Sequence, residues 1–219
     1  GKVYGAADPT LTYVASGLIG GDILTGTQSR VGGENAGTYA ISPGTLANSN
    51  YSISYTGSNL GITPAALTVT ANGLTKTYDK VAFTGGNGVT YTGLTNGDSV
   101  AAGTVTYSGT AQSAVNVGGY TIIPSGLADG NYTISYLNGG LTINPAALTV
   151  TADALGKVYG AADPTLTYVA SGLLGTDTLS GIQNRVAGEN VGDYTISQGS
   201  LANSNYSISY TGSNLGITP

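Results

Sequence analysis

A lysine placed two residues before a tyrosine recurs three times and is the first candidate for chemistry in this sequence. A buried lysine can form an amide (isopeptide) bond with an aspartate or asparagine side chain, but the sequence identifies no partner. The simpler interpretation, which we favour, is that each lysine stem covers its tyrosine ring while the ammonium group stays in water. The pairs are Lys2 and Tyr4, Lys76 and Tyr78, and Lys157 and Tyr159.

Aspartates at recurring places are the second candidate, because paired carboxylates can bind calcium. Calcium takes six to eight oxygen ligands, and the chain has no D-x-D-x-D-G loop to supply them. Asp8 and Asp163 each precede a proline, which is typical of a turn. Asp22, Asp98 and Asp177 each precede a short stretch ended by glycine, which predicts at most one capped helical turn. We therefore expect no metal site.

Most residue types that carry catalysis are missing from the 219 residues. The chain has no histidine, cysteine, methionine or tryptophan, so it lacks the commonest general base and any thiolate. Its many hydroxyl side chains would need an adjacent base to act as nucleophiles. We expect no catalytic residue, no cofactor and no enzymatic activity. The absence of oxidisable cysteine and methionine favours an extracellular location.

The charge of the chain excludes two classes of partner. The net charge is −5, with only six lysines and arginines, so neither nucleic acid nor an anionic membrane surface is an expected ligand. No apolar run approaches the roughly 18 residues of a membrane span. The sequence starts Gly-Lys-Val-Tyr, without methionine or a signal peptide, and we interpret it as part of a longer protein.

Internal repeats set the organisation of the chain. Residues 1–64 and 156–219 align without gaps at 52 of 64 positions, and all twelve differences lie between positions 19 and 45 of the first copy. Residues 120–145 match 39–64 at 13 of 26 positions. We predict three domains, at 1–64 (lacking its first strand), 65–145 and 146–219. Only Pro-Ala-Ala separates successive domains, which predicts stiff joints.

Within each repeat the pattern is that of β-strands. Tyr206-Ser-Ile-Ser-Tyr210 alternates apolar and polar residues between turn-forming segments, and the other repeats have equivalents. A tyrosine in a Gly-x-Tyr-x-Ile string recurs at 39, 120 and 194, and we interpret it as a corner-forming residue. The Asn-x-Ser/Thr sequences at Asn50, Asn131 and Asn205 are explained by a turn before a strand. The fold class is mainly β.

Several motifs together resemble a family of repeats in bacterial surface proteins. Leu148-Thr-Val-Thr-Ala, Tyr159-Gly-Ala-Ala-Asp163-Pro, Ala187-Gly-Glu-Asn and Ile217-Thr-Pro resemble the MBG (YGX-type) repeats. The middle segment, with Lys76-Thr-Tyr-Asp79, is similar to the companion YDG-type repeat, but has Lys80 where glycine is expected. The resemblance implies a large, filamentous-haemagglutinin-like exoprotein and a β-grasp-like domain. An immunoglobulin-like sandwich is the alternative.

The expected function is that of a structural stalk, spacer or fibre-forming region of a bacterial extracellular adhesin. The expected partners are adjacent repeats or neighbouring subunits of a fibre, and three compact domains in an elongated rod would span about 90–120 Å. The alternative is an adhesive module that binds a glycan or a host protein through loop tips. Because the first repeat lacks a strand, we also expect Tyr4–Tyr13 to be more exposed than Tyr159–Tyr168.

Overall fold

The computed structural model describes all residues from 1 to 219 and is built from β-strands and loops. The predicted fold class, mainly β, is confirmed. Threonine, valine, isoleucine and tyrosine alternate with small polar residues, and such segments suit a sheet with one buried face. In the strands Ala65–Ala71 (β5) and Ala146–Ala152 (β12), the four alternate alanine, leucine and valine positions are buried. The structure has no helix that could cross a membrane.

The chain forms two compact units whose limits do not coincide with the sequence repeats. Each unit contains part of the middle repeat together with one terminal repeat, and so each contains one junction between successive repeats. Unit 1 comprises Gly1–Asn72, Asn87–Tyr107 and Ile123–Asn138, and unit 2 comprises Gly73–Gly86, Ser108–Ile122 and Gly139–Pro219.

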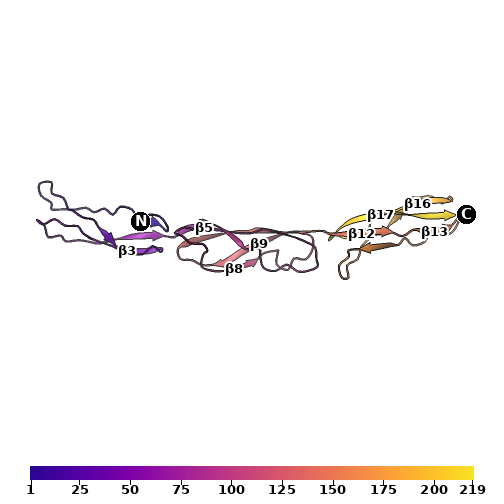
Figure 1. The fold of residues 1–219 in the computed structure, drawn as a ribbon, viewed down its shortest axis with the longest axis horizontal. Helices are drawn as coiled ribbons and strands as arrows, with labels where there is room; N and C mark the ends of the chain where they lie inside the picture. The colour runs from indigo at the N-terminus through magenta and orange to yellow at the C-terminus, as the bar shows by residue number, and fades with distance from the viewer. The chain divides into compact units, whose positions relative to one another are not determined.

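Unit 1 begins with a four-stranded sheet formed by the first repeat. Its strand order is β1-β4-β3-β2, with β3 antiparallel to β4 and β1 parallel to β4. In Figure 1 the indigo and violet segments before and after β3 are drawn mostly as loops. The strands are β1 (Lys2–Val3), β2 (Ser29–Arg30), β3 (Gly37–Ser42) and β4 (Ser58–Thr63).

The rest of unit 1 comes from the middle repeat. The strand β5 lies between a parallel neighbour, β10, and an antiparallel neighbour, β7. Strand β8 pairs with β9, and the Thr106 and Ser125 hydroxyls are in contact across this pair. One buried cluster joins the first and middle repeats, since Tyr4 and Ile62 pack with Leu67, Val69 and Tyr132. The strands are β7 (Val89–Thr92), β8 (Gly103–Ser108), β9 (Gly118–Leu127) and β10 (Tyr132–Leu137).

Unit 2 contains the other strands of the middle repeat and the whole third repeat. In the middle repeat, β11 is parallel to β6 and antiparallel to the first half of β9. The third repeat has two sheets, with strand orders β14-β12-β17 and β13-β18-β16-β15. The strands are β6 (Leu74–Thr77), β11 (Gly139–Asn144), β13 (Leu155–Val158), β14 (Tyr168–Ser171), β15 (Asn184–Arg185), β16 (Gly192–Ser197), β17 (Tyr206–Thr211) and β18 (Ser213–Thr218).

The predicted helical turns are not formed. Asp22, Asp98 and Asp177 each end a turn, in which the aspartate N–H donates to the carbonyl three residues earlier. No helix follows any of these turns. The carboxylates are instead used in the contacts described below.

Neither expected domain topology describes the repeats fully. A β-grasp arrangement needs a helix for the sheet to hold, and the chain has none. The third repeat has two sheets, as an immunoglobulin-like sandwich does, but β12 pairs with β17 and β13 with β18 in parallel. The sheets of immunoglobulin sandwiches are antiparallel.

Candidate inter-repeat interface

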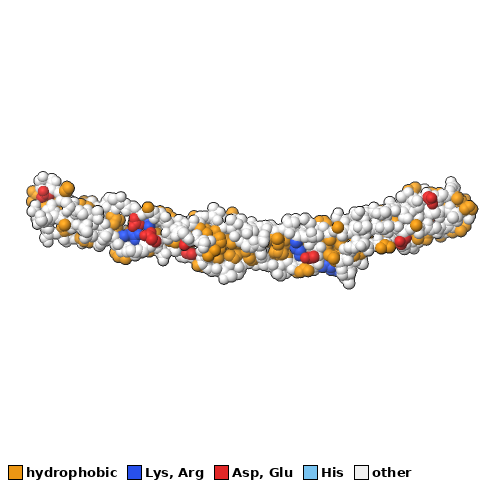
Figure 2. Space-filling model, viewed as in Figure 1, with side chains coloured by type: hydrophobic (Ala, Val, Ile, Leu, Met, Phe, Trp, Pro, Cys, Tyr) orange, Lys and Arg blue, Asp and Glu red, His pale blue; other side chains and the backbone are white.

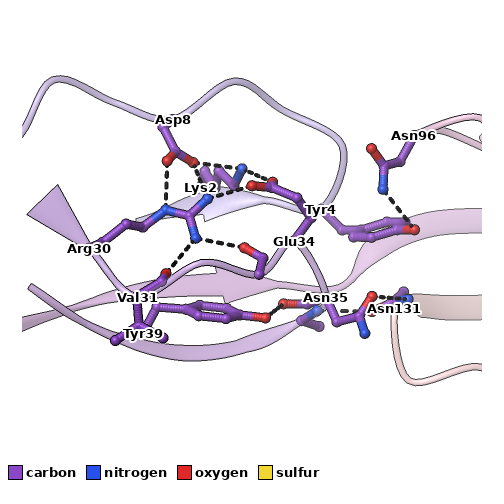
Figure 3. Close-up of polar contacts among 12 residues, drawn as sticks. Lys2, Tyr4, Asp8, Arg30, Val31, Glu34, Asn35, Tyr39, Asn96 and Asn131 are labelled. Carbon is purple, nitrogen blue, oxygen red and sulfur yellow. Dashed lines mark hydrogen bonds and ion pairs between the residues drawn. The ribbon is translucent and has the colours of Figure 1, made fainter.

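A tyrosine of the first repeat is inserted into the middle repeat at the junction in unit 1. The Tyr4 ring packs edge-on against the Tyr132 ring, with centroids 5.4 Å apart and an interplanar angle of 82°. Both hydroxyls donate to the same Asp98 oxygen, at 3.0 Å from Tyr4 and 2.7 Å from Tyr132. The Asn96 amide also donates to the Tyr4 hydroxyl at 3.2 Å, as the right side of Figure 3 shows. Burial and hydrogen bonding therefore both hold the Tyr4 side chain in place.

The junction in unit 2 repeats this geometry with corresponding residues. The Tyr78 and Tyr206 rings lie edge-on at 5.5 Å and 78°. Their hydroxyls donate to one Asp177 oxygen at 2.8 and 2.7 Å. The Lys80 ammonium group pairs with the other Asp177 oxygen at 2.8 Å. The two junctions thus share the pair of rings and the shared carboxylate, and the lysine contact occurs in unit 2 alone.

Electrostatics at the unit 2 junction favour the ionised aspartate and the neutral tyrosines. The Lys80 ammonium, followed by the Tyr206 and Tyr78 hydroxyls, lowers the pKa of Asp177 from 3.8 to about 2. Loss of solvent, followed by the nearby Asp177 carboxylate, raises the pKa of Tyr78 above its usual value of 10. Near neutral pH both tyrosines are therefore donors and Asp177 is an acceptor.

Lys80 explains why the middle repeat departs from the expected glycine. Its φ of 63° lies in the left-handed region, which glycine adopts without steric cost. The strained lysine gains an ion pair with Asp177 that a glycine could not form. At position 80 the chain therefore has a strained backbone and gains a charged contact at the junction.

An asparagine makes a second pair of contacts at each junction. The side-chain carbonyl of Asn131 accepts the Ala36 N–H at 2.9 Å, and its NH₂ donates to Asn35 at 3.2 Å. In unit 2, Asn205 accepts the Val117 N–H at 2.9 Å and donates to the Asn116 side chain at 3.0 Å. These asparagines belong to the Asn-x-Ser/Thr sequences, so a glycan on either one would remove the amide from its partners.

In the first repeat, Tyr51 and Asp22 correspond to Tyr206 and Asp177, and they lie outside the two junctions. The Tyr51 hydroxyl donates to Asp22 at 2.8 Å, as Tyr206 does to Asp177. In the third repeat, Tyr159 corresponds to the inserted tyrosines Tyr4 and Tyr78. Tyr159 is 60% exposed, whereas Tyr4 is 5% exposed. The expectation that Tyr4–Tyr13 is more exposed than Tyr159–Tyr168 is wrong at Tyr4, because Tyr4 lies in the junction, whereas at the other end of the region Tyr13 is 42% exposed and Tyr168 is half-buried.

An ion-pair cluster lies beside the inserted tyrosine in the first repeat (Figure 3). The Lys2 ammonium contacts Asp8 at 2.7 Å and also pairs with Glu34. The Arg30 guanidinium binds both Asp8 oxygens, at 2.6 and 3.0 Å, and reaches the Glu34 carboxylate. The third repeat has the same cluster, made by Lys157, Asp163, Arg185 and Glu189.

The prediction that the ammonium groups of Lys2 and Lys157 stay in water is therefore wrong. The Lys2 and Lys157 side chains are only 4% exposed, and their ammonium groups are held by carboxylates. In Figure 2 the cationic side chains on the visible face lie next to carboxylates, and most of the remaining surface is uncharged. The sequence prediction missed Arg30 and Arg185, whose recurrence at corresponding positions was the available signal.

The charge states of the cluster disfavour an isopeptide bond. Arg30, followed by Lys2, lowers the pKa of Asp8 to about 2, and Asp8 with Glu34 raises the pKa of Lys2. Amide formation needs a neutral amine and a protonated carboxyl group that can lose water. The cluster instead favours the ammonium group and the carboxylate. The same carboxylates are neutralised by lysine and arginine, which does not suit a calcium site.

The arginine of the cluster also holds the recurring corner tyrosine. The Arg30 guanidinium lies 5.3 Å from the Tyr39 ring centroid, and Arg185 lies at the same distance from Tyr194. The Tyr39 hydroxyl donates to the Asn35 carbonyl at 2.8 Å, four residues earlier. Tyr120 and Tyr194 make the corresponding bond. This places the Asn35 and Asn116 loops where they meet the next repeat.

Comparison with known proteins agrees with the repeat organisation. The model of the MBG domain family (YGX type) matches residues 1–61, 67–142 and 148–216, which include the YDG-like middle segment. No curated protein matches the chain. Because the three matches extend over nearly all 219 residues, this chain belongs to the MBG domain family of the YGX type, as three tandem repeats.

Proposed function

We propose that the chain is a structural, non-catalytic spacer of a bacterial extracellular protein, in which each repeat is locked to the next. MBG repeats occur in bacterial surface proteins. The observation that supports the spacer role is the junction itself. Two rings, one shared carboxylate and one asparagine make the same contacts in unit 1 and in unit 2. A ligand-binding role would not require these contacts to recur between repeats.

The junction combines features that resist bending. The buried cluster of unit 1 continues from the first repeat into the middle repeat, so bending would expose apolar surface. Tyr4 donates to Asp98, and the Ala36 N–H donates to the Asn131 side chain. These two hydrogen bonds use different residues of each repeat, and together they restrict rotation. Backbone bonds Ala65 N–H to Asn131 and Ala146 N–H to Asn205 place the linker beside the same asparagine. A locked joint is what a spacer needs.

The test uses the absence of cysteine, which permits clean spin labelling. Thr75→Cys and Ser207→Cys place labels on exposed sites on either side of the unit 2 junction. We expect one narrow distance distribution, which Asp177→Ala broadens because Tyr78 and Lys80 lose their acceptor. Asp22→Ala is the matched control, since Asp22 accepts from Tyr51 within its own repeat. A broad distribution without the Asp177 substitution, or no broadening with it, would refute the locked joint.

Small-angle scattering tests the spacer role at the level of the chain. Three locked compact domains in line predict a maximum dimension of about 90–120 Å. A compact distance distribution would contradict the proposal even if the joint itself were rigid.

An adhesive role is the second candidate, and one observation favours it. The differences between the first and third repeats fall at every second residue from 19 to 29, and these positions are exposed. Surface variation of this kind suits a ligand-contacting face. Saturable binding of the chain to a glycan array or to host cells, changed by exchanging residues 19–45 for those of the third repeat, would support it.

A further inference from the structure

Two turns meet at each junction, and their sequences differ between unit 1 and unit 2. The inserting turn contains the inserted tyrosine and is Tyr4-Gly-Ala6 in unit 1 and Tyr78-Asp-Lys80 in unit 2. The receiving turn ends at the aspartate that the two tyrosines share, and is Thr95-Asn-Gly-Asp98 in unit 1 and Leu174-Gly-Thr-Asp177 in unit 2. The rings, the carboxylate and the asparagine contacts are common to both junctions, so the junctions differ at these turns.

The inserting turn of unit 1 needs a glycine, which packs directly on the receiving turn. The Ala6 N–H donates to the carbonyl three residues earlier at 3.0 Å, and the φ of Gly5 is +80°. This is a type II turn, whose third residue is ordinarily glycine. A Cβ at Gly5 would lie 2.9 Å from the Thr95 Cβ and closer still to the other two atoms of that side chain. A side chain at position 5 therefore has no room in unit 1.

The inserting turn of unit 2 is built differently and reaches across the receiving turn. The Asp79 carboxylate accepts the Val81 N–H at 2.9 Å, and Lys80 has the positive φ. The Lys80 ammonium donates to the Leu174 carbonyl at 3.4 Å and to the Asp177 carboxylate at 2.8 Å. These two acceptors are the first and last residues of the receiving turn, so the lysine binds both of its ends.

One position of the receiving turn, two residues before the shared aspartate, decides whether this lysine fits. It is Gly175 in unit 2, where an added Cβ would lie 3.3 Å from the Lys80 Nζ and 3.7 Å from its Cδ. In unit 1 it is Asn96, whose amide donates to the Tyr4 hydroxyl at 3.2 Å. The backbones are alike, with φ of 54° at Gly175 and 56° at Asn96. An asparagine side chain here therefore competes with the lysine for the space beside the carboxylate.

We propose that these turns decide which type of repeat docks on which, so that a repeat of one type joins a repeat of the other type. The Tyr-Gly-Ala turn fits the Thr-Asn-Gly-Asp turn, because its glycine leaves room for the threonine and its alanine is too short to meet the asparagine. The Tyr-Asp-Lys turn fits the Leu-Gly-Thr-Asp turn, because its lysine reaches the aspartate past a glycine. The inference rests on the proposed spacer role, since it requires repeats that lock at these junctions.

Each repeat in the chain has an inserting turn that does not match its own receiving turn. The first and third repeats have the Tyr-Gly-Ala turn and a glycine at the deciding position (Gly20 and Gly175), whereas the middle repeat has the Tyr-Asp-Lys turn and Asn96. Two middle-type repeats would bring the lysine against the asparagine. Two repeats of the other type would leave an aspartate oxygen without its lysine. Specific interfaces commonly combine a favourable contact with the right partner and a clash with the wrong one.

Exchange of the turns at the unit 2 junction tests this pairing in the full chain, with the same labels at positions 75 and 207. Either exchange alone should widen the distance distribution at least about twofold, and both together should restore a narrow one, because the matched pair of unit 1 is then rebuilt. The inserting exchange is Asp79→Gly with Lys80→Ala, and the receiving exchange is Leu174→Thr with Gly175→Asn and Thr176→Gly.

Rescue by the double exchange distinguishes specificity from simple damage, since two independent losses would add. If both single exchanges leave the distribution narrow, or the double exchange is as wide as the single ones, the pairing rule is wrong and the locked joint stands. A broad distribution in the labelled chain without any exchange contradicts the locked joint itself, and this inference with it.

A single substitution with a matched control isolates the deciding position. Gly175→Asn should widen the distribution, because the new side chain displaces the Lys80 ammonium from Asp177. Thr176→Asn places the same side chain at the next, exposed residue and should leave the distribution narrow. Equal widths for the two variants overturn the assignment of position 175.

The glycine of the unit 1 inserting turn has its own control in the third repeat. Gly5 and Gly160 have φ of +80° and +81°, but a Cβ at Gly160 would meet nothing within 4 Å. Gly5→Ala should therefore lower the urea midpoint more than Gly160→Ala does, and Thr95→Gly should remove this difference. Equal midpoints for the two alanine variants, or a difference that persists with Thr95→Gly, overturn the role of the glycine in pairing.

Discussion

At the scale of single residues, the chain concentrates its few charges in places where they have specific partners. Arg30 binds Asp8 through two nitrogens, Arg185 binds Asp163 through its Nε, and both arginines also lie over a tyrosine ring. Arginine suits both contacts because its guanidinium is planar and permanently charged. With four carboxylates and four cations in the two clusters, the charge of each cluster is balanced.

The clusters predict a loss of stability in acid. The pKa of Asp163 is about 2 in the folded chain, against 3.8 ordinarily, because Arg185 and then Lys157 favour the carboxylate. The unfolded chain binds more protons between these values, so stability should fall as pH drops from about 4 to about 2. Urea denaturation at pH 5, 3 and 2 measures this. Asp163→Asn should flatten the decline, and an unchanged decline would show that Asp163 contributes little to it.

At the scale of elements, glycines decide how the chain enters the strand that contains the corner tyrosine. A Cβ at Gly188 would lie 2.1 Å from the Tyr194 ring, and the φ of Gly188 is +152°. Gly192, at the start of β16, has a φ of +150° and nothing within 4 Å of the same position. Both glycines therefore have a backbone conformation that other residues rarely adopt, but only Gly188 has no room for a Cβ.

This difference predicts the ranking of two substitutions. Gly188→Ala should destabilise the chain by about 2 kcal/mol more than Gly192→Ala, because the added methyl displaces the ring from Arg185 and the Asn190 carbonyl. Thermal or urea unfolding of the two variants measures it. Equal losses would mean that the ring moves without cost and that its packing is loose.

At the scale of the whole molecule, the repeats are similar in sequence but differ in their sheets. The third repeat has a three-stranded sheet that the first repeat lacks, although their loops and ion-pair clusters correspond. Stability is rarely uniform along a chain, and regions with fewer paired strands open more easily. Within residues 1–219, the first repeat should be the least stable part.

Native-state amide exchange provides the measurement. Residues 13–16 and 51–56 should exchange faster than their identical counterparts 168–171 and 206–211, which pair with β12. The comparison is internally controlled, since intrinsic exchange rates follow the shared local sequence. Similar protection in the two copies would show that the first repeat pairs these segments by another route.

The fold class, the repeats and the alternation of the strands could be predicted from the amino-acid sequence alone. Strand Tyr206–Thr211 and the corner tyrosines follow from local patterns of apolar, polar and glycine residues, which act over a few positions. Local patterns also misled, since Asp177 has the position of a helix cap but accepts hydrogen bonds from tyrosines.

The contacts between repeats could not be predicted in this way, because they depend on residues that are distant in the sequence. Tyr4 and Tyr159 stand in identical sequences from Gly1 to Leu18 and from Gly156 to Leu173, yet one is 5% exposed and the other 60%. The difference comes from Asp98 and Tyr132, which reach Tyr4 from 94 and 128 positions along the chain. Burial depends on what packs against a side chain, so two identical segments have different environments when only one has a neighbour.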